Sequence, residues 1–439
     1  MHDFKIPLTF QEQPVWSAPA KPFIKYLASA YKASGHRQTQ PVLSNRNLLS
    51  PDIDLNHYKC QAVIDWIDLR LETLNTHQAV NIQKNIAKKL KARGSVSTIY
   101  VMGPNKEPRY QGETFILKLQ QPQPAELADL LYDILSEYPT YEDRASEVQI
   151  AGIEISIDFY VKPDATVDAE TMILRRWQMT DVLRRHLKPE PILTRDDQCH
   201  PRFFWKNGAQ FFVKETPVAL GQHAQDELIR LGVDERFWAP FSLRAHHQPQ
   251  IDATSWIGKK DHPVMLRIMD KVTDQRNPST NTHLDLSPDL HRSRVEVTLQ
   301  GDIGTLGAHG ALNFITVSDL YGHKFQDIRP PIFAFYLPTI GSTCDTTCLP
   351  FPTKVREIEV FKLSGTYGLD LLHRSIEAVQ QAQFHQGDIS RRPTVLRKKG
   401  RTISYVALNQ KVDRALRGLA KKWAIPPDSL HRDRMALAA

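Results

Sequence analysis

The stretch Ile153-Glu-Ile-Ser-Ile-Asp-Phe-Tyr-Val161 alternates strictly between apolar and polar side chains. Side chains two residues apart on a strand share a face, so the alternation predicts a β-strand with one buried and one polar face. Two carboxylates and a phenol would then lie on one surface of a strand that is otherwise strongly apolar, which makes that surface a candidate site. The residues of this polar face are Glu154, Ser156, Asp158 and Tyr160.

This strand opens the second of two similar patterns, each of which reads strand, helix, strand, strand. Duplication of a half-sheet predicts one large functional sheet rather than an array of repeats. The fold class expected is therefore α+β, with a duplicated antiparallel-rich sheet unit, flanking helices and a pseudo-two-fold axis. The predicted strands are 63–71, 97–103 and 113–119 in the first unit, and 153–161, 255–258, 265–271 and 292–299 in the second.

The rest of the chain is arranged around these two units. Long insertions in compact domains tend to be functional, and one interrupts the second unit at 189–252. The predicted domains are an N-terminal arm (1–55), the first unit (56–148), the second unit with its insertion (149–312) and a basic helical C-terminal region (313–439). Helices are predicted at 23–31, 125–136, 169–187, 368–382 and 404–423.

Composition narrows the class of protein. The 439 residues are 41% hydrophobic, enough for a real core, and carry a net charge of +7, which favours a polyanionic partner. No apolar run approaches the roughly 20 residues that cross a bilayer, and the first residues lack the pattern of a signal peptide. A P-loop motif is absent, which disfavours ATPases and helicases of that type. We therefore expect a cytoplasmic protein that does not contact a membrane.

The two later strands of the second unit carry basic side chains on their polar faces. If these strands lie beside the first one, Glu154, Asp158 and Glu296 would form an acidic group. Grouped carboxylates suit Mg²⁺ or Mn²⁺, and neighbouring cations would hold phosphate oxygens. The competing interpretation is an amphipathic sheet whose outer face carries ordinary cross-strand ion pairs. The cations that would surround the acidic group are Arg267, Lys271, Arg292 and Arg294.

Two consecutive basic elements lie near the C-terminus. One is a segment between the last two predicted helices, and the other is the final helix itself. A run of like charge is often a solvated face, but two such elements in succession favour a salt-sensitive contact with a DNA backbone. The predicted DNA-binding residues of the segment are Arg391, Arg392, Arg397, Lys398, Lys399 and Arg401.

Five short motifs, in order over about residues 60–305, resemble those of rolling-circle replication initiators. The resemblance is to the relaxase-like initiators of the trans-acting plasmid, conjugative-element and filamentous-phage gene II type. The motifs are Ile64-Asp-Trp-Ile67, Gly152-Ile-Glu-Ile-Ser-Ile-Asp-Phe-Tyr160, Trp256-Ile-Gly-Lys-Lys260, Arg267-Ile-Met-Asp-Lys271 and Arg294-Val-Glu296.

The resemblance implies an activity and its partners. The expected function is replication initiation on a mobile element such as a phage, plasmid or integrative element, with recognition of duplex and single-stranded origin DNA and metal-dependent nicking and rejoining. A host helicase is a further partner that the resemblance allows. A tyrosine in these families attacks the phosphodiester and leaves a 5′-phosphotyrosyl link and a free 3′-hydroxyl. Carried over to this chain, the Mg²⁺ or Mn²⁺ ligands are Glu154, Asp158 and Glu296, and the phosphate-holding residues are Arg267, Lys271 and Arg294.

The expected tyrosine of the fourth motif is replaced by Met269, and a thioether cannot attack phosphorus. Three alternatives follow. The protein binds an origin without nicking it; or another tyrosine attacks, with Tyr160 the best placed and Tyr100 next; or a metal-activated water attacks. A further alternative is a structural or partner-binding protein whose sheet has no connection with DNA. The sequence leaves the origin, the metal and the oligomeric state open.

Overall fold

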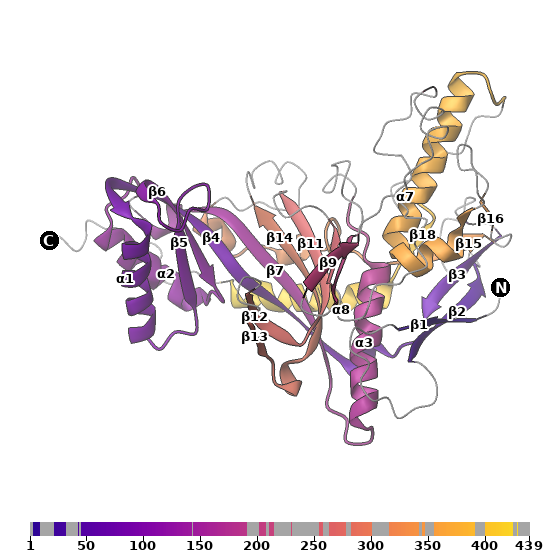
Figure 1. Ribbon diagram of the computed structural model, residues 1–439, viewed down its shortest axis with the longest axis horizontal. Helices are drawn as coiled ribbons and strands as arrows, with labels where there is room; N and C mark the ends of the chain where they lie inside the picture. Colours follow the sequence, from indigo (N-terminus) through magenta and orange to yellow (C-terminus); the bar gives the residue numbers. More distant parts are fainter. Residues whose placement is uncertain are drawn as a thin grey trace.

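The protein combines helices with antiparallel sheets, as the α+β prediction requires, and its largest element is a nine-stranded sheet (Figure 1). The description rests on a computed structural model. The residues that it describes are 3–8, 22–31, 43, 45–142, 144–190, 202–207, 210–214, 230, 254–257, 263–277, 282–300, 316–341, 345–346, 355–390, 400–424 and 428.

Two long strands pair antiparallel at the centre of the large sheet, β4 (Tyr58–Gln78) and β7 (Gln149–Val161). In each predicted unit the last strand pairs with the first, since β6 pairs with β4 and β14 pairs with β7. This confirms that the charged strands of the second unit are neighbours, while the pseudo-two-fold axis stays a prediction. The full order is β5 (Thr98–Met102), β6 (Gln111–Gln120), β4, β7, β14 (Arg292–Gln300), β11 (Val264–Lys271), β10 (Thr254–Ile257), β8 (Arg202–Asn207) and β9 (Gln210–Lys214).

Helices pack on the apolar face of this sheet and leave the charged face on the other side. Ile153, Ile155 and Ile157 of β7 are fully buried in one core cluster that also includes apolar residues of the helices. In Figure 1, α1 and α2 lie at the end of the sheet formed by β5 and β6, and α8 runs behind the central strands. None of the described helices is long and apolar enough to cross a membrane. The helices of this layer are α1 (Ala79–Ala92), α2 (Pro124–Glu137), α3 (Ala169–His186) and α8 (Val406–Lys422).

Three of the predicted helices, at 125–136, 169–187 and 404–423, are confirmed as α2, α3 and α8. The one predicted at 368–382 lies within the longer α7 (Glu357–His385). Gly365 has a φ of 65° inside α7, and a Cβ there would lie 2.5 Å from the carbonyl oxygen of Arg185. The chain can therefore pass α3 at this point only with glycine.

A second sheet has five strands, which come from residues 4–51 and 336–404. The prediction of a helix at 23–31 is wrong, because this segment is β2, paired on both sides. Its alternating burial shows that cross-strand partners override the helical appearance of the local sequence. The predicted arm and the predicted C-terminal region thus share one sheet, since β3 pairs with β15. In order, its strands are β1 (Phe4–Pro7), β2 (Phe23–Ala30), β3 (Arg46–Pro51), β15 (Tyr336–Gly341) and β18 (Thr402–Ser404).

The remaining described elements are short. They are β12 (Thr273–Asn277) with β13 (Thr282–Asp285), β16 (Asp345–Thr346) with β17 (Val355–Arg356), and α6 (Val317–Leu320).

A buried carboxylate ties α7 to the second sheet. Glu357 accepts hydrogen bonds from the Arg46 guanidinium at 2.7 Å and from the Gly341 amide at 2.8 Å. His373 Nε2 lies 2.8 Å from its other oxygen. Burial alone would raise the pKa of Glu357, but His373 and Arg46 outweigh burial and hold that pKa far below its usual range. The carboxylate is therefore charged in the folded protein at neutral pH.

Removing this carboxylate should destabilise the protein strongly. Glu357→Ala leaves Arg46 buried without its partner, so we expect the free energy of unfolding to fall by about 3–5 kcal/mol. Because the folded pKa is depressed, the wild-type contribution is present above about pH 4.3 and is lost as the pH falls below that value. Urea denaturation at pH 7 measures the change. The control Glu137→Ala breaks an exposed pair with Lys89 and should cost less than about 1 kcal/mol.

Candidate metal centre

The polar face of β7, β14 and β11 is a grid of rows, each formed by residues directly opposite one another on neighbouring strands. Successive rows are about 7 Å apart, the length of two residues of a strand. The register places a carboxylate in each of the first three rows. These rows are Glu154, Thr298 and Met265; Ser156, Glu296 and Arg267; and Asp158, Arg294 and Met269.

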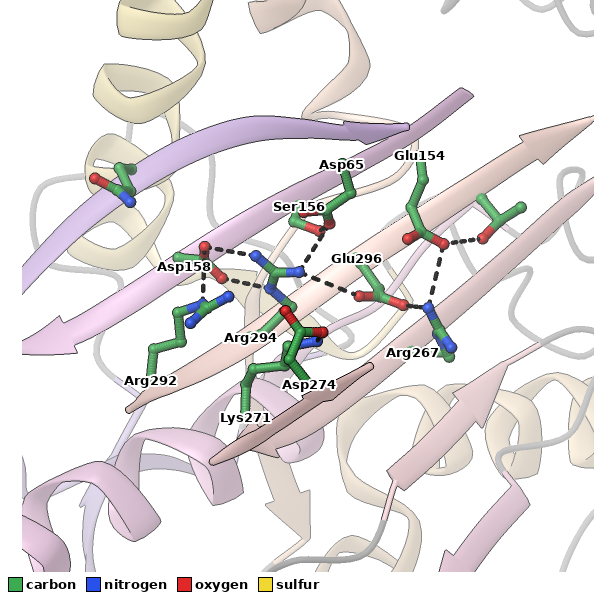
Figure 2. Close-up of polar contacts among 12 residues, drawn as sticks. Asp65, Glu154, Ser156, Asp158, Arg267, Lys271, Asp274, Arg292, Arg294 and Glu296 are labelled. Atoms are coloured by element: carbon green, nitrogen blue, oxygen red, sulfur yellow. Dashed lines mark hydrogen bonds and ion pairs between the residues drawn. The ribbon is translucent and has the colours of Figure 1, made fainter. Parts of the chain in front are cut away.

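A β-bulge in β4 adds a fourth acid to this face. The register between β4 and β7 shifts at Asp65, since Ile64 pairs with Ile155 whereas Trp66 pairs with Glu154. The alternation of β4 shifts with it, so that Ile64 and Ile67 are both buried in the core. A bulge places two consecutive side chains near the same face. Asp65 consequently points toward β7 and β14 (Figure 2).

Three carboxylates from three adjacent strands converge here. One oxygen each of Asp65, Glu154 and Glu296 lies within 4.8 Å of the others, and we call these residues the carboxylate cluster. Glu154 and Glu296 are buried, whereas Asp65 is partly exposed. A donor set of carboxylate oxygens at this spacing fits a hard divalent cation such as Mg²⁺ or Mn²⁺.

Asp158, which the sequence grouped with the metal ligands, lies outside the cluster. Arg294 Nε and Nη2 bind its two oxygens at 2.6 and 2.7 Å, and Arg292 lies 3.2 Å from Oδ2. Both oxygens are therefore engaged by guanidinium groups, which is the consequence of a register that places Arg294 directly opposite Asp158. Asp65 completes the group instead. Its signal in the sequence was the break in alternation at Ile64-Asp-Trp-Ile67.

Arg294 holds the cluster and Asp158 together. It is almost fully buried, and its Nη1 donates to Asp65 Oδ2 at 2.8 Å and lies 3.8 Å from Glu296 Oε2 (Figure 2). Burial alone would lower the pKa of Arg294, but Asp158 and then Asp65 outweigh it and raise that pKa well above the ordinary value. Arg294 is thus a fixed positive charge beside the cluster.

Arg267 lies on the other side of the cluster. Its Nη2 is 3.2 Å from Glu154 Oε2 and forms a second, close ion pair with Glu296. Thr298 Oγ1 donates to Glu154 at 2.7 Å, and Ser156 Oγ donates to Asp65. These hydroxyls orient the carboxylates, which is how outer contacts tune a metal site.

The predicted nucleophile lies at the margin of this face. Tyr160 follows Asp158 on β7, two rows or about 13 Å along the strand from Ser156. Gln61 donates to its hydroxyl at 3.2 Å, and the Arg292 guanidinium lies 5.7 Å from its ring centroid. Burial, followed by the charge of Asp158, raises the pKa of Tyr160 despite the nearby arginines. Met269 sits one row from Arg267 and opposite Arg294.

The other predicted site residues are more dispersed. Lys271 lies one row beyond Met269 and pairs with Asp274 at 2.8 Å. Arg401 pairs with Glu357 at 3.5 Å, at the contact between α7 and the second sheet and not on the strands of the cluster. The remaining predicted DNA-binding residues, Arg391, Arg392, Arg397, Lys398 and Lys399, lie outside the described residues.

On the polar face of the first unit, a lysine and an aspartate pair with each other. Lys118 Nζ lies 3.0 Å from Asp68 Oδ1 and 3.0 Å from the centroid of the Trp66 ring. Burial lowers the pKa of Lys118 and raises that of Asp68, in each case against the effect of the partner. Asp68 is therefore paired within the first unit, whereas Asp65 of the same strand belongs to the carboxylate cluster.

Comparisons with known proteins leave the function to be argued from this geometry. No family model matches the chain, and no curated protein matches it in sequence. Among solved structures, a rolling circle replication initiator protein from Geobacillus stearothermophilus is similar over 72% of this chain and 97% of that chain, with 10% sequence identity and a TM-score of 0.26.

The cluster makes a prediction about metal binding. Asp65→Asn should weaken Mn²⁺ binding at least about tenfold, because it removes a charged ligand, as isothermal titration calorimetry would show. Asp68→Asn is the matched control, since Asp68 lies on the same face of β4 but outside the cluster. Equal Mn²⁺ affinity in Asp65→Asn and the wild type would contradict the assignment.

Proposed function

We propose that this protein initiates DNA replication by metal-dependent nicking and rejoining of a DNA strand at the polar face of the nine-stranded sheet. The observation that carries the proposal is the carboxylate cluster, flanked by Arg267 and Arg294. Carboxylates that hold Mg²⁺ or Mn²⁺ beside guanidinium groups suit phosphoryl transfer, because both cations stabilise charge on the phosphate oxygens.

The motifs support the DNA-directed part of the proposal. All three residues of the cluster fall in segments that resemble rolling-circle initiators, namely the Asp-Trp strand, the second-unit strand and the Arg-x-Glu segment. These segments are far apart in the sequence, yet β4, β7 and β14 are adjacent in the sheet. Origin recognition on a mobile element, with duplex and single-stranded DNA as partners, is the role that this resemblance supports best.

Tyr160 is the residue that we propose as the nucleophile. All 13 tyrosines of the chain lie in the part that the structure describes, so each can be placed. Two of them share the polar face, Tyr100 on the outermost strand β5 and Tyr160 on β7 beside Asp158. The separations are similar, because Tyr100 is three strand spacings from β7, or about 14 Å. What differs is the neighbours: Lys118 and Trp66 lie between Tyr100 and the cluster, whereas Arg292 lies beside Tyr160.

In the proposed reaction, the Tyr160 oxygen attacks phosphorus as the bond to the 3′ oxygen breaks. The products are a 5′-phosphotyrosyl link and a free 3′-hydroxyl, and rejoining reverses the step. Gln61 donates to the Tyr160 oxygen and so stabilises the phenolate that attacks after the phenol has lost its proton to solvent, and the departing 3′ oxygen takes up a proton from solvent. Arg267 and Arg294 stabilise the charge that develops on the phosphate oxygens. A bound Mg²⁺ or Mn²⁺ would polarise the same oxygens.

Met269 favours a second function. The methionine lies opposite Arg294, one row from the cluster, where the resemblance expects the attacking tyrosine. A protein that has lost its nucleophile would still present Arg267 and the sheet to DNA. Binding of an origin without nicking, as in a replication-control protein, is therefore the alternative to an active nickase.

Nicking of supercoiled DNA separates the two functions. With DNA that carries the protein's own gene and flanking region and with Mn²⁺, we expect nicked circles and a covalent protein–DNA adduct. Tyr160→Phe should abolish the adduct, whereas the control Tyr100→Phe should preserve it. Denaturing gel electrophoresis and mass spectrometry of the linked peptide are the measurements.

Each other result of that experiment has a distinct meaning. An adduct mapped to a different residue would refute Tyr160 but preserve the activity. Nicking without an adduct would indicate attack by water. Specific binding with neither product, in wild type and variants alike, would establish the alternative function.

The raised pKa of Tyr160 predicts a pH dependence of nicking. Because that pKa exceeds the ordinary value of 10, the reactive phenolate is scarce at neutral pH. Its fraction rises about tenfold for each pH unit below the pKa, so the single-turnover nicking rate should rise throughout pH 6–9. A rate that reaches a plateau near pH 7 would contradict attack by this phenol.

A further inference from the structure

The three arginines at the candidate metal centre are held in different ways. Arg294 is anchored by both oxygens of Asp158, and Arg292 contacts Asp158 and the Leu290 carbonyl oxygen. The ion pairs of Arg267 in the described part of the chain are to Glu154 and Glu296 alone. Arg267 is thus the arginine whose carboxylate partners both belong to the cluster that would hold the cation.

Arg267 is also the arginine with the most freedom to leave. Its side chain is 28% exposed, compared with 11% for Arg292 and 4% for Arg294. Its Nε, like that of Arg292, is buried without a hydrogen-bond partner among the described residues, so the carboxylates do not satisfy its guanidinium fully. Trp256, directly opposite on β10, offers an aromatic surface, with its ring centroid 5.1 Å from the guanidinium carbon.

The charges decide what must happen when a cation arrives. Together with Asp158, the cluster carries four formal negative charges, and Arg292 and Arg294, which Asp158 holds, remain beside them as two positive charges. A divalent cation brings this total to zero, so Arg267 would then be an excess positive charge next to the metal. Like charges at such short range repel strongly where burial lowers the effective dielectric constant.

We propose that Arg267 occupies the cluster when no metal is bound and transfers to a DNA phosphate when Mg²⁺ or Mn²⁺ binds. This inference rests on the proposed function, and it makes Arg267 the residue that couples the binding of metal and DNA. In the free protein its guanidinium neutralises Glu154 and Glu296 and keeps the buried carboxylates from repelling one another. Displaced by the cation, the same guanidinium is available for bidentate contact with a phosphate.

The consequence is that metal and DNA assist one another's binding. The metal releases Arg267 for the phosphate, and the phosphate removes the competitor from the carboxylates. Thermodynamic linkage requires the two effects to be equal in magnitude. Arg292 provides a matched control, because it is on the same face and binds a carboxylate that is not in the cluster.

Isothermal titration with Mn²⁺ tests the transfer without relying on catalysis. All variants carry Tyr160→Phe so that DNA stays intact, and each is titrated with and without a single-stranded oligonucleotide. We expect Arg267→Gln to bind Mn²⁺ roughly tenfold more tightly than its parent in the absence of DNA, because the competing cation is gone. The gain from adding the oligonucleotide should be smaller than in the parent. Arg292→Gln should match the parent in both respects.

The possible failures are distinguishable. If the parent binds Mn²⁺ but Arg267→Gln binds it equally or more weakly, Arg267 merely supports the carboxylates and the inference is overturned while the metal centre stands. If the parent binds no Mn²⁺ with or without DNA, the metal centre and the inference fall together. Thermal denaturation of each variant confirms that the comparison is made between folded proteins.

Tryptophan fluorescence reports the movement directly. Departure of Arg267 from the Trp256 ring should change the emission when Mg²⁺, which is not a paramagnetic quencher, is added, and Trp256→Phe should remove that change. Emission of Trp256 that is unaffected by saturating Mg²⁺ would show that the guanidinium stays in place, against the proposal.

Discussion

The buried guanidinium of Arg294 is the constraint on which the candidate site depends. A charge so fully removed from water must be paired, and Arg294 is paired with Asp158 on β7 and Asp65 on β4 while it is itself on β14. It therefore fixes the side chains of three strands in one arrangement. Moving the register of β14 by one residue would turn Arg294 and Glu296 into the apolar core, so the sheet pairing and the charge pairing enforce each other.

The sequence predicted the second unit well because apolar and polar side chains alternate along its strands, and this alternation determines which side chains lie on each face of the sheet. The polar face of Ile153–Val161 followed from that period, and the placement of Glu154 with Glu296 followed from the period and the assumption that the two strands are neighbours. Asp65 could not be placed in this way, because its orientation comes from a bulge that exists only through pairing with β7. Similarly, the local sequence of Phe23–Ala30 predicts a helix. The segment is a strand because it pairs with β1 and β3, and a pattern within the segment carries no information about these partners.

The role of Asp158 shows how register decides chemistry that composition leaves open. Two acids on one strand are equivalent in the sequence, four residues apart and on the same face. What separates them is the residue opposite each, since Asp158 faces Arg294 whereas Glu154 faces Thr298. One acid is neutralised by a bidentate pair, and the other keeps an oxygen for the cluster. A threonine or an arginine at the facing position thus distinguishes a candidate metal ligand, Glu154, from a carboxylate that only supports the site, Asp158.

If the proposed function holds, the two faces of the sheet limit how DNA would bind. The apolar residues of α8, such as Val412 and Leu416, pack into the core beneath the sheet, and its exposed Arg414, Arg417 and Lys421 belong to that helical layer. The carboxylate cluster lies on the opposite face of the same strands. A strand of DNA at the cluster would consequently be held by cations of the sheet itself, among them Arg267. The basic helix would reach the same molecule only through a segment of DNA that passes around the edge of the sheet.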